Sequence, residues 1–508
     1  MARRRVLVLD RRKPTRYAER SIYIWGGGIC FLRSPRPVSF SRMHFFAPLL
    51  VAAAVSATAV PNLEDGPTIH KFASKGVITD GALRYVNNSG ICETTAGVHT
   101  MSGYADVSSS VHTWFWFFAA RNNANTAPFT LWLNGGPGCS SMIGLFQENG
   151  PCNVNSDGKT TVLNPYSWNE VSNMIYIDQP TGTGFSYGTD TVTSTVTAAS
   201  QIWTVIQLLF ESPEFSSYAS RDFILATESY GGHYGPEFSE YFEDQNGKIA
   251  SGSISGVTIH LTALMINNGW IDPLIQNLAY VTFAQNAPGY GPLVSASEVT
   301  KMNNTYYQKN GCLAQQQNCY AAGNSSSSNS ICEDADNFCG SLFEDAVGNR
   351  DPYDLSQSSA AAFPPEYYVN YLGLSSVTKA IGATSSSYSE CPDAPYNKFV
   401  PSGDDARTFL PALTNMINLG LRVLVWAGDL DGNYQAVLAM DWPGAAELKA
   451  TPLTNITVSG TPVAAVVNVD NFSFARVFKA GHEVSAYVPA GALAIFEQIM
   501  ANEPLHSV

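Results

Sequence analysis

Residues 223–235 read FILATESYGGHYG, and this stretch decides the fold. The apolar run 223–226 predicts a buried strand, and a helical pattern is expected from about Gly235. Between them, small residues surround Ser229, as in a nucleophile elbow, where a sharp strand-to-helix turn exposes a serine hydroxyl above the sheet. The usual elbow is G-x-S-x-G, but Thr227 occupies the first glycine position. On these residues alone, a serine that merely caps a helix stays open as the alternative.

Short apolar runs and helical stretches alternate on both sides of this segment. Residues 129–133 (FTLWL), 174–177 (MIYI) and 422–427 (RVLVWA) predict strands, and 198–209 predicts a helix. This alternation predicts an α/β fold with a mainly parallel central sheet. The segment 274–375 is polar and contains four cysteines, so we interpret it as an inserted subdomain stapled by disulfides, with a disordered linker as the alternative.

A serine hydroxyl needs a base to take its proton and an acid to orient that base. In α/β-hydrolases the acid and then the histidine follow the serine in chain order. Asp431, just after the predicted strand 422–427, and His482, in a glycine-containing loop, obey that order. His233, four residues after Ser229, is the competing base, and its structural alternative is a hydrogen-bonded core histidine.

Composition and charge exclude some classes of function. The 508 residues are 45% hydrophobic, which is enough for a large core. Residues 1–42 have a net charge of +9, which leaves −23 on the remainder of a chain whose total is −14. A region this acidic is a poor candidate for nucleic-acid binding, because it would repel phosphates. Its acidity also suits a protein that works at acid pH.

The N-terminal region predicts export. Residues 43–59 contain a short apolar run that ends in Ala57-Thr58-Ala59, which is typical of a signal peptide and too short to span a bilayer. We therefore expect a secreted protein without a membrane anchor, with a vacuolar destination as the alternative. Residues 1–42 are interpreted as a basic extension from a mis-assigned start, or as a long basic leader. The expected core then occupies 60–273 and 376–508, on either side of the insertion 274–375.

The cysteines agree with export. Apart from Cys30 there are eight, an even number that predicts disulfides in an oxidising compartment, with buried thiols as the alternative. Asparagines in N-x-S/T triplets are candidate glycosylation sites at Asn87, Asn303, Asn324, Asn455 and Asn471. Without clustered histidine ligands or a nucleotide-binding loop, we expect no metal and no cofactor.

Seven segments of the chain match the motifs of one protein family and occur in the same order as in that family. They are 132–141 (WLNGGPGCSS), 144–151 (GLFQENGP), 178–187 (DQPTGTGFSY), 228–234 (ESYGGHY), 267–273 (NNGWIDP), 428–431 (GDLD) and 481–484 (GHEV). Over roughly residues 85–505 the chain resembles the serine carboxypeptidases, most closely the secreted fungal members. The resemblance implies an α/β-hydrolase fold with an inserted lid, and hydrolysis of the C-terminal peptide bond through an acyl-enzyme.

The resemblance also implies roles for individual residues. Ser229 becomes the nucleophile, His482 the general base and Asp431 the acid that orients it, while Asp429 is structural. The oxyanion hole is assigned to the backbone N–H groups of Gly136 and Tyr230.

The terminal carboxylate of the substrate is assigned to Asn134, Gly135, Glu148 and Glu228. Like charges in contact cannot both ionise easily, so the two glutamates are expected to share a proton and donate it to that carboxylate. This predicts acid-optimal activity, with a KM that rises with pH.

Three departures from the family pattern modify these expectations. Glu483 stands where many members have methionine, so it is a candidate for the leaving-residue pocket and could select Lys or Arg there. No cysteine closely follows Asp431, so a reactive thiol is not expected at that place. Ser485 replaces the usual proline.

The family's disulfide pattern implies four pairs. Two nested pairs, Cys312–Cys339 and Cys319–Cys332, fall within the insertion, and Cys139–Cys391 links the GGPGC segment to the chain after it. Cys92 is then left with Cys152.

Two other classes of function stay open. The same scaffold could transfer its acyl group to an alcohol or act as an esterase or hydroxynitrile lyase, or it could be a secreted binding protein without catalysis. Peptide and protein C-termini are the expected partners, and the oligomeric state is not predicted.

Overall fold

The computed structural model describes residues 58–59, 67–74, 81–287, 289–357, 363–384, 387–429, 438 and 440–508. The N-terminal extension 1–42, residues 43–57 of the expected signal peptide, Cys30 and the candidate triad residue Asp431 lie outside these ranges.

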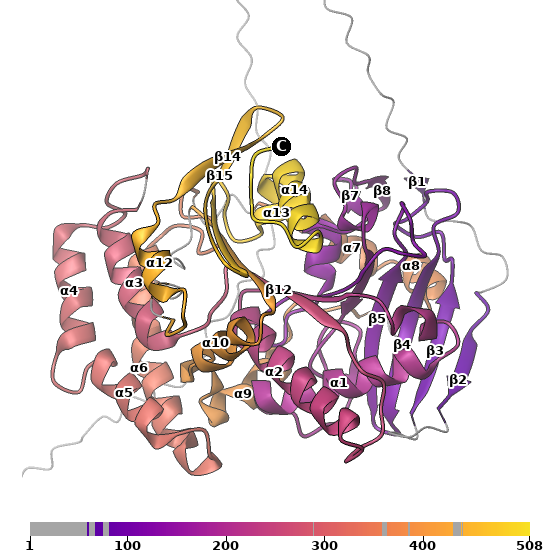
Figure 1. Cartoon of the computed structure of the whole chain (residues 1–508), viewed down its shortest axis with the longest axis horizontal. Helices are drawn as coiled ribbons and strands as arrows, with labels where there is room; N and C mark the ends of the chain where they lie inside the picture. Colours follow the sequence, from indigo (N-terminus) through magenta and orange to yellow (C-terminus); the bar gives the residue numbers. More distant parts are fainter. Residues whose placement is uncertain are drawn as a thin grey trace, which may run out of the picture. The chain divides into compact units, whose positions relative to one another are not determined.

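One large mixed sheet forms the centre of the fold (Figure 1). Its neighbouring strands β9, β6, β11, β12, β13 and β16 run parallel, and antiparallel strands extend it on both flanks. The prediction of a mainly parallel sheet is therefore confirmed for the central strands only. In the order of the sheet, the bounds are β14 Thr454–Val458, β15 Thr461–Val469, β16 Phe472–Val477, β13 Arg422–Gly428, β12 Leu261–Asn267, β11 Phe223–Glu228, β6 Phe129–Leu133, β9 Asn173–Ile177, β5 Val111–Phe118, β4 Thr100–Ser108, β3 Ala82–Asn87 and β2 His70–Ala73.

Among the described residues, four further short strands lie outside this order. β1 (Thr58–Ala59), β8 (Thr160–Leu163) and β7 (Cys152–Val154) form a small antiparallel sheet. β10 (Tyr187–Gly188) pairs with β5.

The large sheet has an apolar core on each face, because successive side chains of a strand point to opposite sides. In β11, Phe223 and Leu225 belong to one core and Ile224 and Ala226 to the other. The first core also contains residues of α1 (Thr195–Glu211), α2 (Gly231–Ala250) and α10 (Leu410–Asn418). The second contains residues of α7 (Tyr367–Leu372), α8 (Ser375–Ile381), α13 (Val484–Tyr487) and α14 (Pro489–Met500).

The expected insertion is mainly helical, which rules out a disordered linker for its described residues. α3 (Pro273–Gln285), α4 (Ala296–Tyr307), α5 (Cys312–Ala322) and α6 (Asn329–Val347) lie side by side (Figure 1). Val281, Met302, Tyr306 and Leu342 form part of a separate small core among them. The boundaries 274–375 stay a prediction. Two more helices, α9 (Asp393–Phe399) and α12 (Ala445–Ala450), follow in the chain.

The structure contains the four disulfides that the resemblance implied. They are Cys92–Cys152, Cys139–Cys391, Cys312–Cys339 and Cys319–Cys332. The last two tie α5 to α6, and Cys139–Cys391 joins residues that lie 252 positions apart, before and after the insertion.

Candidate active site

Ser229 lies on a tight turn between β11 and α2. Its backbone φ is +64°, in the left-handed region that side chains rarely adopt. The turn is held by hydrogen bonds from the Ser229 N–H to the Asn267 carbonyl (2.9 Å) and from the Trp270 N–H to the Ser229 carbonyl (2.8 Å). This turn is the elbow that the sequence predicts. The helix α2 that follows it begins at Gly231, four residues earlier than expected.

Small residues make this turn possible. A Cβ on Gly231 would come within 2.5 Å of the Thr227 side chain, and one on Gly232 within 2.5 Å of the Trp270 backbone. Thr227, which replaces the usual first glycine, donates its hydroxyl to the Gly231 carbonyl at 2.9 Å. The replacement therefore adds a hydrogen bond across the elbow instead of disrupting it.

Ser229 and His482 line one cavity of about 390 Å³, together with Gly136 and Tyr230. The His482 loop is anchored through its backbone: its N–H donates to the Tyr353 carbonyl at 2.8 Å, and its carbonyl accepts from the Asn267 amide at 3.1 Å. The structure thus brings together two residues that are separated by 253 positions in the chain.

Asp429, the neighbouring acid of the same loop, accepts a hydrogen bond from the Lys479 N–H at 2.7 Å, which fits the structural role expected for it.

His233 does not share this cavity. Its side chain is fully buried, and Nδ1 contacts the Trp270 carbonyl oxygen. Burial lowers the pKa of its imidazole, which keeps it neutral. These contacts are those of the structural alternative, a core histidine.

The segment with the candidate oxyanion-hole glycine is tightly packed. Gly136 has a φ of +113°, and a Cβ there would meet the Cys139 backbone N at 2.6 Å. The Asp178 carboxylate anchors the following residues, accepting from the Ser140 hydroxyl at 2.6 Å and the Ser141 N–H at 3.1 Å. Burial raises the pKa of Asp178 to about 7.

A pair of buried carboxyl groups, Glu148 and Glu228, lies near Asn134, the residue that follows β6. Glu228 ends β11, and Glu148 ends a single turn of π-helix over Gly144–Glu148. Asn134, just after β6, donates its amide to Glu228 Oε1 at 3.0 Å, and its Oδ1 accepts from the Trp132 indole at 2.7 Å. Glu148 lies close enough to Glu228 for its charge to act on that carboxyl.

Burial is the main cause that raises the pKa of both carboxyls. The pKa of Glu148 rises to about 8, and that of Glu228 lies well above its ordinary value, where the charge of Glu148 adds to the effect of burial. At acid pH the pair is therefore protonated, and it can donate a hydrogen bond to an anion. The shared proton that the resemblance implies stays a prediction.

Gly135 packs directly on the elbow. A Cβ at this position would meet the Tyr230 backbone N at 2.4 Å and the Glu228 carbonyl at 2.7 Å. Only glycine leaves the backbone of this segment free to approach the elbow.

Asn267 is a site residue that sequence analysis missed. Its amide donates both to Glu228 Oε2 (2.7 Å) and to the His482 carbonyl (3.1 Å), so it links the acid pair to the histidine loop. The available signal was its place directly after the apolar run of β12, at the sheet edge where strand ends meet.

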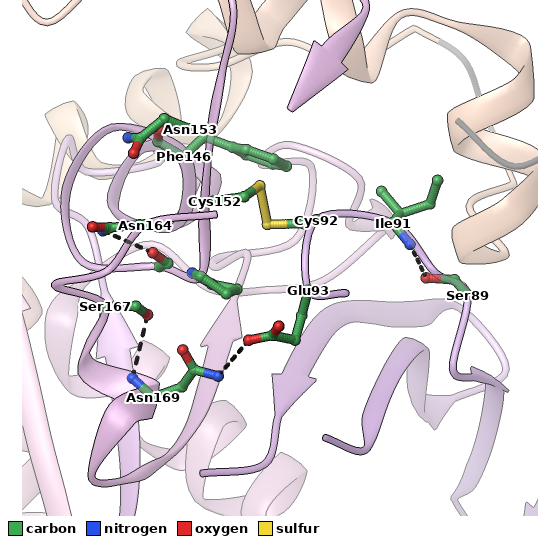
Figure 2. The surroundings of a disulfide bond; sticks show 12 residues. Ser89, Ile91, Cys92, Glu93, Phe146, Cys152, Asn153, Asn164, Ser167 and Asn169 are labelled. Atoms are coloured by element: carbon green, nitrogen blue, oxygen red, sulfur yellow. Dashed lines mark hydrogen bonds between the residues drawn. A yellow bond between two sulfur atoms is a disulfide. The ribbon is translucent and has the colours of Figure 1, made fainter. Parts of the chain in front are cut away.

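The Glu148 turn is braced by a buried network next to a disulfide (Figure 2). Cys152 bonds to Cys92, and the neighbouring Glu93 accepts from the Asn169 amide at 2.9 Å. Asn164 donates its amide to the Gly150 carbonyl at 3.0 Å.

Arg121 joins these elements. It forms ion pairs with Glu93 (2.8 Å) and Glu170 (2.7 Å), and it donates to the Pro151 carbonyl at 3.0 Å. The network fixes the segment that follows Glu148 directly.

Glu483 lies next to His482 and near the acid pair. Burial and then the charge of Glu228 raise its pKa to about 8. In acid the side chain is thus a neutral hydrogen-bond donor, and it becomes an anion only as the pH rises.

The five candidate glycosylation sites differ in accessibility. Asn324 and Asn455 are exposed, and Asn87 and Asn303 are partly buried. The Asn471 amide donates to the carbonyls of Ile417 (2.9 Å) and Leu421 (2.6 Å), so its nitrogen is already engaged.

In the described ranges, no group of three or more His, Cys, Asp or Glu side chains has the arrangement of a metal site. The helices there are also too short or too polar to cross a bilayer.

Comparison with known proteins gives a consistent result. The sequence profile of a family described as "Serine carboxypeptidase" matches residues 91–502. The chain is 48% identical to carboxypeptidase S1 of Penicillium janthinellum, over 83% of this chain and 100% of that protein. It is 34% identical to carboxypeptidase S1 homolog A of Arthroderma otae, over 91% and 83% of the two chains.

A solved carboxypeptidase structure is also similar to this chain. The chain is similar to Kex1Δp, a prohormone-processing carboxypeptidase from Saccharomyces cerevisiae, with a TM-score of 0.63 and 25% identity over 80% of this chain and 91% of that one.

Proposed function

The chain belongs to the serine carboxypeptidase family, and we propose that Ser229, His482 and Asp431 are the catalytic triad with which this peptidase removes C-terminal residues at acid pH. The observation that carries the proposal is that Ser229, on its strained turn, and His482 line one cavity, with the buried carboxyls of Glu228 and Glu148 close to this turn.

The proposed reaction begins with attack of the Ser229 hydroxyl on the carbonyl carbon of the last peptide bond, while His482 takes the hydroxyl proton. The backbone N–H groups of Gly136 and Tyr230 stabilise the negative oxygen of the tetrahedral intermediate. His482 then returns the proton to the leaving amine, and the terminal residue departs. Water, activated by the same histidine, hydrolyses the acyl-enzyme.

The acid pair restricts this chemistry to chain ends. Asn134, the Gly135 N–H and the protonated pair Glu148–Glu228 would bind the terminal carboxylate of the substrate. The raised pKa values fix the direction of the effect: below about pH 8 Glu148 still holds a proton to donate, and above that pH it becomes a negative carboxylate that faces the negative substrate. KM is therefore expected to rise with pH.

The decisive experiment measures release of the free terminal amino acid from a blocked dipeptide, between about pH 4 and about pH 8. KM should stay low in acid and rise for the wild type as the pH nears about 8, where Glu148 loses its proton, and it should depend less on pH for Glu148→Gln. Ser229→Ala should lose roughly six orders of magnitude in kcat. A KM that stays flat across the range would refute the role of the pair. Transfer of the acyl group to an added alcohol without release of acid would instead favour the acyltransferase or esterase alternative.

The specificity and destination of the enzyme are also part of this proposal. Glu483 would line the pocket of the leaving residue. The signal peptide expected over 43–59, the four disulfides and the exposed N-x-S/T sites Asn324 and Asn455 support passage through the secretory pathway. We propose an extracellular or vacuolar destination.

A further inference from the structure

A second cavity, of about 330 Å³, lies where the insertion meets the core. Its volume is within the range of small-molecule sites. Neither Ser229 nor His482 lines it, so the proposed peptidase reaction gives it no role. Its walls come from three parts of the chain: the middle of α2, the end of α5 with the residues after it, and the segment 407–412 that leads into α10.

Asn324 connects this cavity to the surface. It lines the cavity, yet the residue is exposed. It also begins the triplet Asn324-Ser325-Ser326, shortly after α5 ends at Ala322. Such a triplet is an acceptor for N-glycosylation. A sugar bonded to this asparagine therefore has direct access to the cavity.

The contacts of Asn324 leave its nitrogen available. Arg407 Nη1 lies 3.5 Å from Asn324 Oδ1, so the buried guanidinium holds the oxygen side of the amide. In the described part of the chain, no group accepts a hydrogen bond from the Asn324 nitrogen. Asn303 and Asn471 differ, because each donates its amide nitrogen to a backbone carbonyl at 2.9 Å. A sugar on Asn324 thus displaces no internal hydrogen bond.

The walls offer the groups that an N-acetylated sugar binds. Glu237 and Glu240 of α2 line the cavity as half-buried carboxyls. Glu240 accepts from the Asn415 amide at 2.7 Å, whereas no described residue donates to Glu237. A carboxyl that loses water without gaining a donor is unfavourable, and sugar hydroxyls supply donors. The Tyr320 and Phe409 rings add apolar surface, against which the C–H face of a pyranose packs.

The occupant is limited to the sugar nearest the protein, because each later sugar of a glycan lies further from the asparagine. We propose that an N-glycan on Asn324 places its first N-acetylglucosamine in this cavity and so clamps the insertion to the core. This inference goes beyond the peptidase reaction, and it rests on the proposed passage through the secretory pathway.

The modification uses a donor that belongs to that pathway, an oligosaccharide bonded to a lipid diphosphate. The Asn324 Nδ2 forms a bond to the anomeric carbon of the first sugar, and the bond from that carbon to the diphosphate oxygen breaks. The lipid diphosphate leaves with the electron pair of the broken bond, and the amide nitrogen gives up one proton. The Ser326 hydroxyl completes the triplet that directs this transfer.

The clamp would act where the disulfides do not. Cys312–Cys339 and Cys319–Cys332 tie α5 to α6, and neither reaches α2 or α10. Arg407 supplies a direct link between the two sides, since it donates to the Gly323 carbonyl at 2.9 Å. A sugar that contacts both walls adds to this link. Because α3, α5 and α6 also supply part of the wall around Ser229, the clamp supports the active site as well.

The test uses the full chain secreted from a eukaryotic host, with its glycans either intact or trimmed by an endoglycosidase that leaves one N-acetylglucosamine on each asparagine. Mass spectrometry of the peptide with Asn324 should find the sugar. The intact and trimmed proteins should melt at the same temperature at one fixed scan rate, because the first sugar stays in place.

Variants then separate the sugar from the asparagine. Ser326→Ala destroys the triplet but keeps Asn324 and its contact with Arg407, and it should lower the melting temperature by about 2 °C or more. Ser325→Ala leaves the triplet intact and is the matched control, with an unchanged melting temperature expected. Asn455→Gln removes an exposed triplet from strand β14 of the core and should also have no effect.

A further variant locates the sugar. Ala412 is buried and lines the cavity, so Ala412→Leu fills space that the sugar would need. It should lower the melting temperature of the glycosylated protein more than that of the Ser326→Ala protein. Equal effects in both backgrounds would place the sugar outside the cavity and overturn the proposal.

The remaining outcomes are equally decisive. A melting temperature that Ser326→Ala leaves unchanged overturns the clamp, and so does a loss of stability on trimming, which would assign the effect to the outer sugars. Sugar on Asn455 with none on Asn324 refutes the clamp alone. A chain without sugar at any triplet refutes the clamp together with the proposed secretory passage. Release of a terminal amino acid from a blocked dipeptide tests the peptidase function independently of all these results.

Discussion

Asn267 illustrates how much one side chain can do at the end of a strand. Its amide holds Glu228 in place and also binds the backbone beside His482. Glu228 and the His482 loop are therefore positioned by a common residue, although Glu228 ends β11 and His482 lies in the loop after β16.

Asn267→Ala is expected to impair substrate binding more than folding. Without the amide, Glu228 Oε2 loses a donor and its carboxyl can rotate away from Glu148. We expect KM for a blocked dipeptide to rise about tenfold, the range for a lost hydrogen bond to an ionisable group. Asn268→Ala, which alters the neighbouring amide that does not contact Glu228, is the control for loop disturbance. An unchanged KM in Asn267→Ala would show that Asn134 alone is sufficient to hold Glu228.

Glu483 should select for basic leaving residues only when it is ionised. Since its pKa is raised to about 8, the preference for a terminal Arg over a terminal Leu should grow as the pH approaches that value. Glu483→Met should abolish the growth, measured as the ratio of kcat/KM for the two substrates. An equal ratio in both proteins at every pH would remove Glu483 from the pocket.

At the scale of elements, the Arg121 network supports the turn with Glu148. The pKa of Glu93 shows how strong this network is. Burial opposes ionisation of Glu93, but the charge of Arg121 and the hydrogen bonds from Asn169 and Thr95 outweigh burial, so the pKa of Glu93 is lowered. An ion pair of this kind is costly to break on one side only, because the remaining charge stays buried.

Arg121→Met should lower the free energy of unfolding by about 3–5 kcal/mol, the usual cost of leaving a buried charge unpaired. Chemical denaturation would measure it. Lys301→Met removes an exposed ion pair with Asp345 and should cost no more than about 1 kcal/mol. Adding Glu93→Gln to Arg121→Met should recover part of the loss. Equal effects of the two single variants would contradict a structural role for the network.

The sequence predicted elements whose signal is local and missed contacts that depend on distant parts of the chain. The apolar runs of β6, β11 and β13 identify buried strands because three to five consecutive apolar residues between turn signals leave little choice. The antiparallel flanks were not foreseen, since pairing direction depends on the partner strand. The cavity beside Asn324 escaped notice for a similar reason: its walls come from α2, α5 and the segment that leads into α10, and only the fold places them together.

For the whole molecule, buried carboxyls set the pH range of stability. Burial is the main cause that raises the pKa of Glu148, Asp178, Glu237 and Glu483 to between about 7 and about 8. The unfolded chain would release these protons near pH 4.5, so the folded state binds more protons and loses stability as the pH rises between the two values. Glu93 and Asp190, whose pKa values are lowered, act in the opposite sense and lose their contribution in stronger acid.

The melting temperature should therefore be higher near about pH 5 than near about pH 8. Thermal unfolding at one fixed scan rate would measure the difference. The double variant Glu148→Gln, Glu483→Gln removes two of the titrating groups and should reduce the loss. A melting temperature that climbs steadily to neutral pH would show that other groups dominate.

The Cys139–Cys391 bond has a consequence for how the enzyme can be processed. It bridges the two halves of the sheet around the whole insertion, with 252 positions between its ends. A protease that nicks the polypeptide anywhere inside that span would leave two fragments still covalently coupled, each contributing strands to the same sheet. Maturation of this molecule into a two-chain form is thus compatible with an intact catalytic edge, since Ser229 and His482 would stay on fragments that cannot diffuse apart.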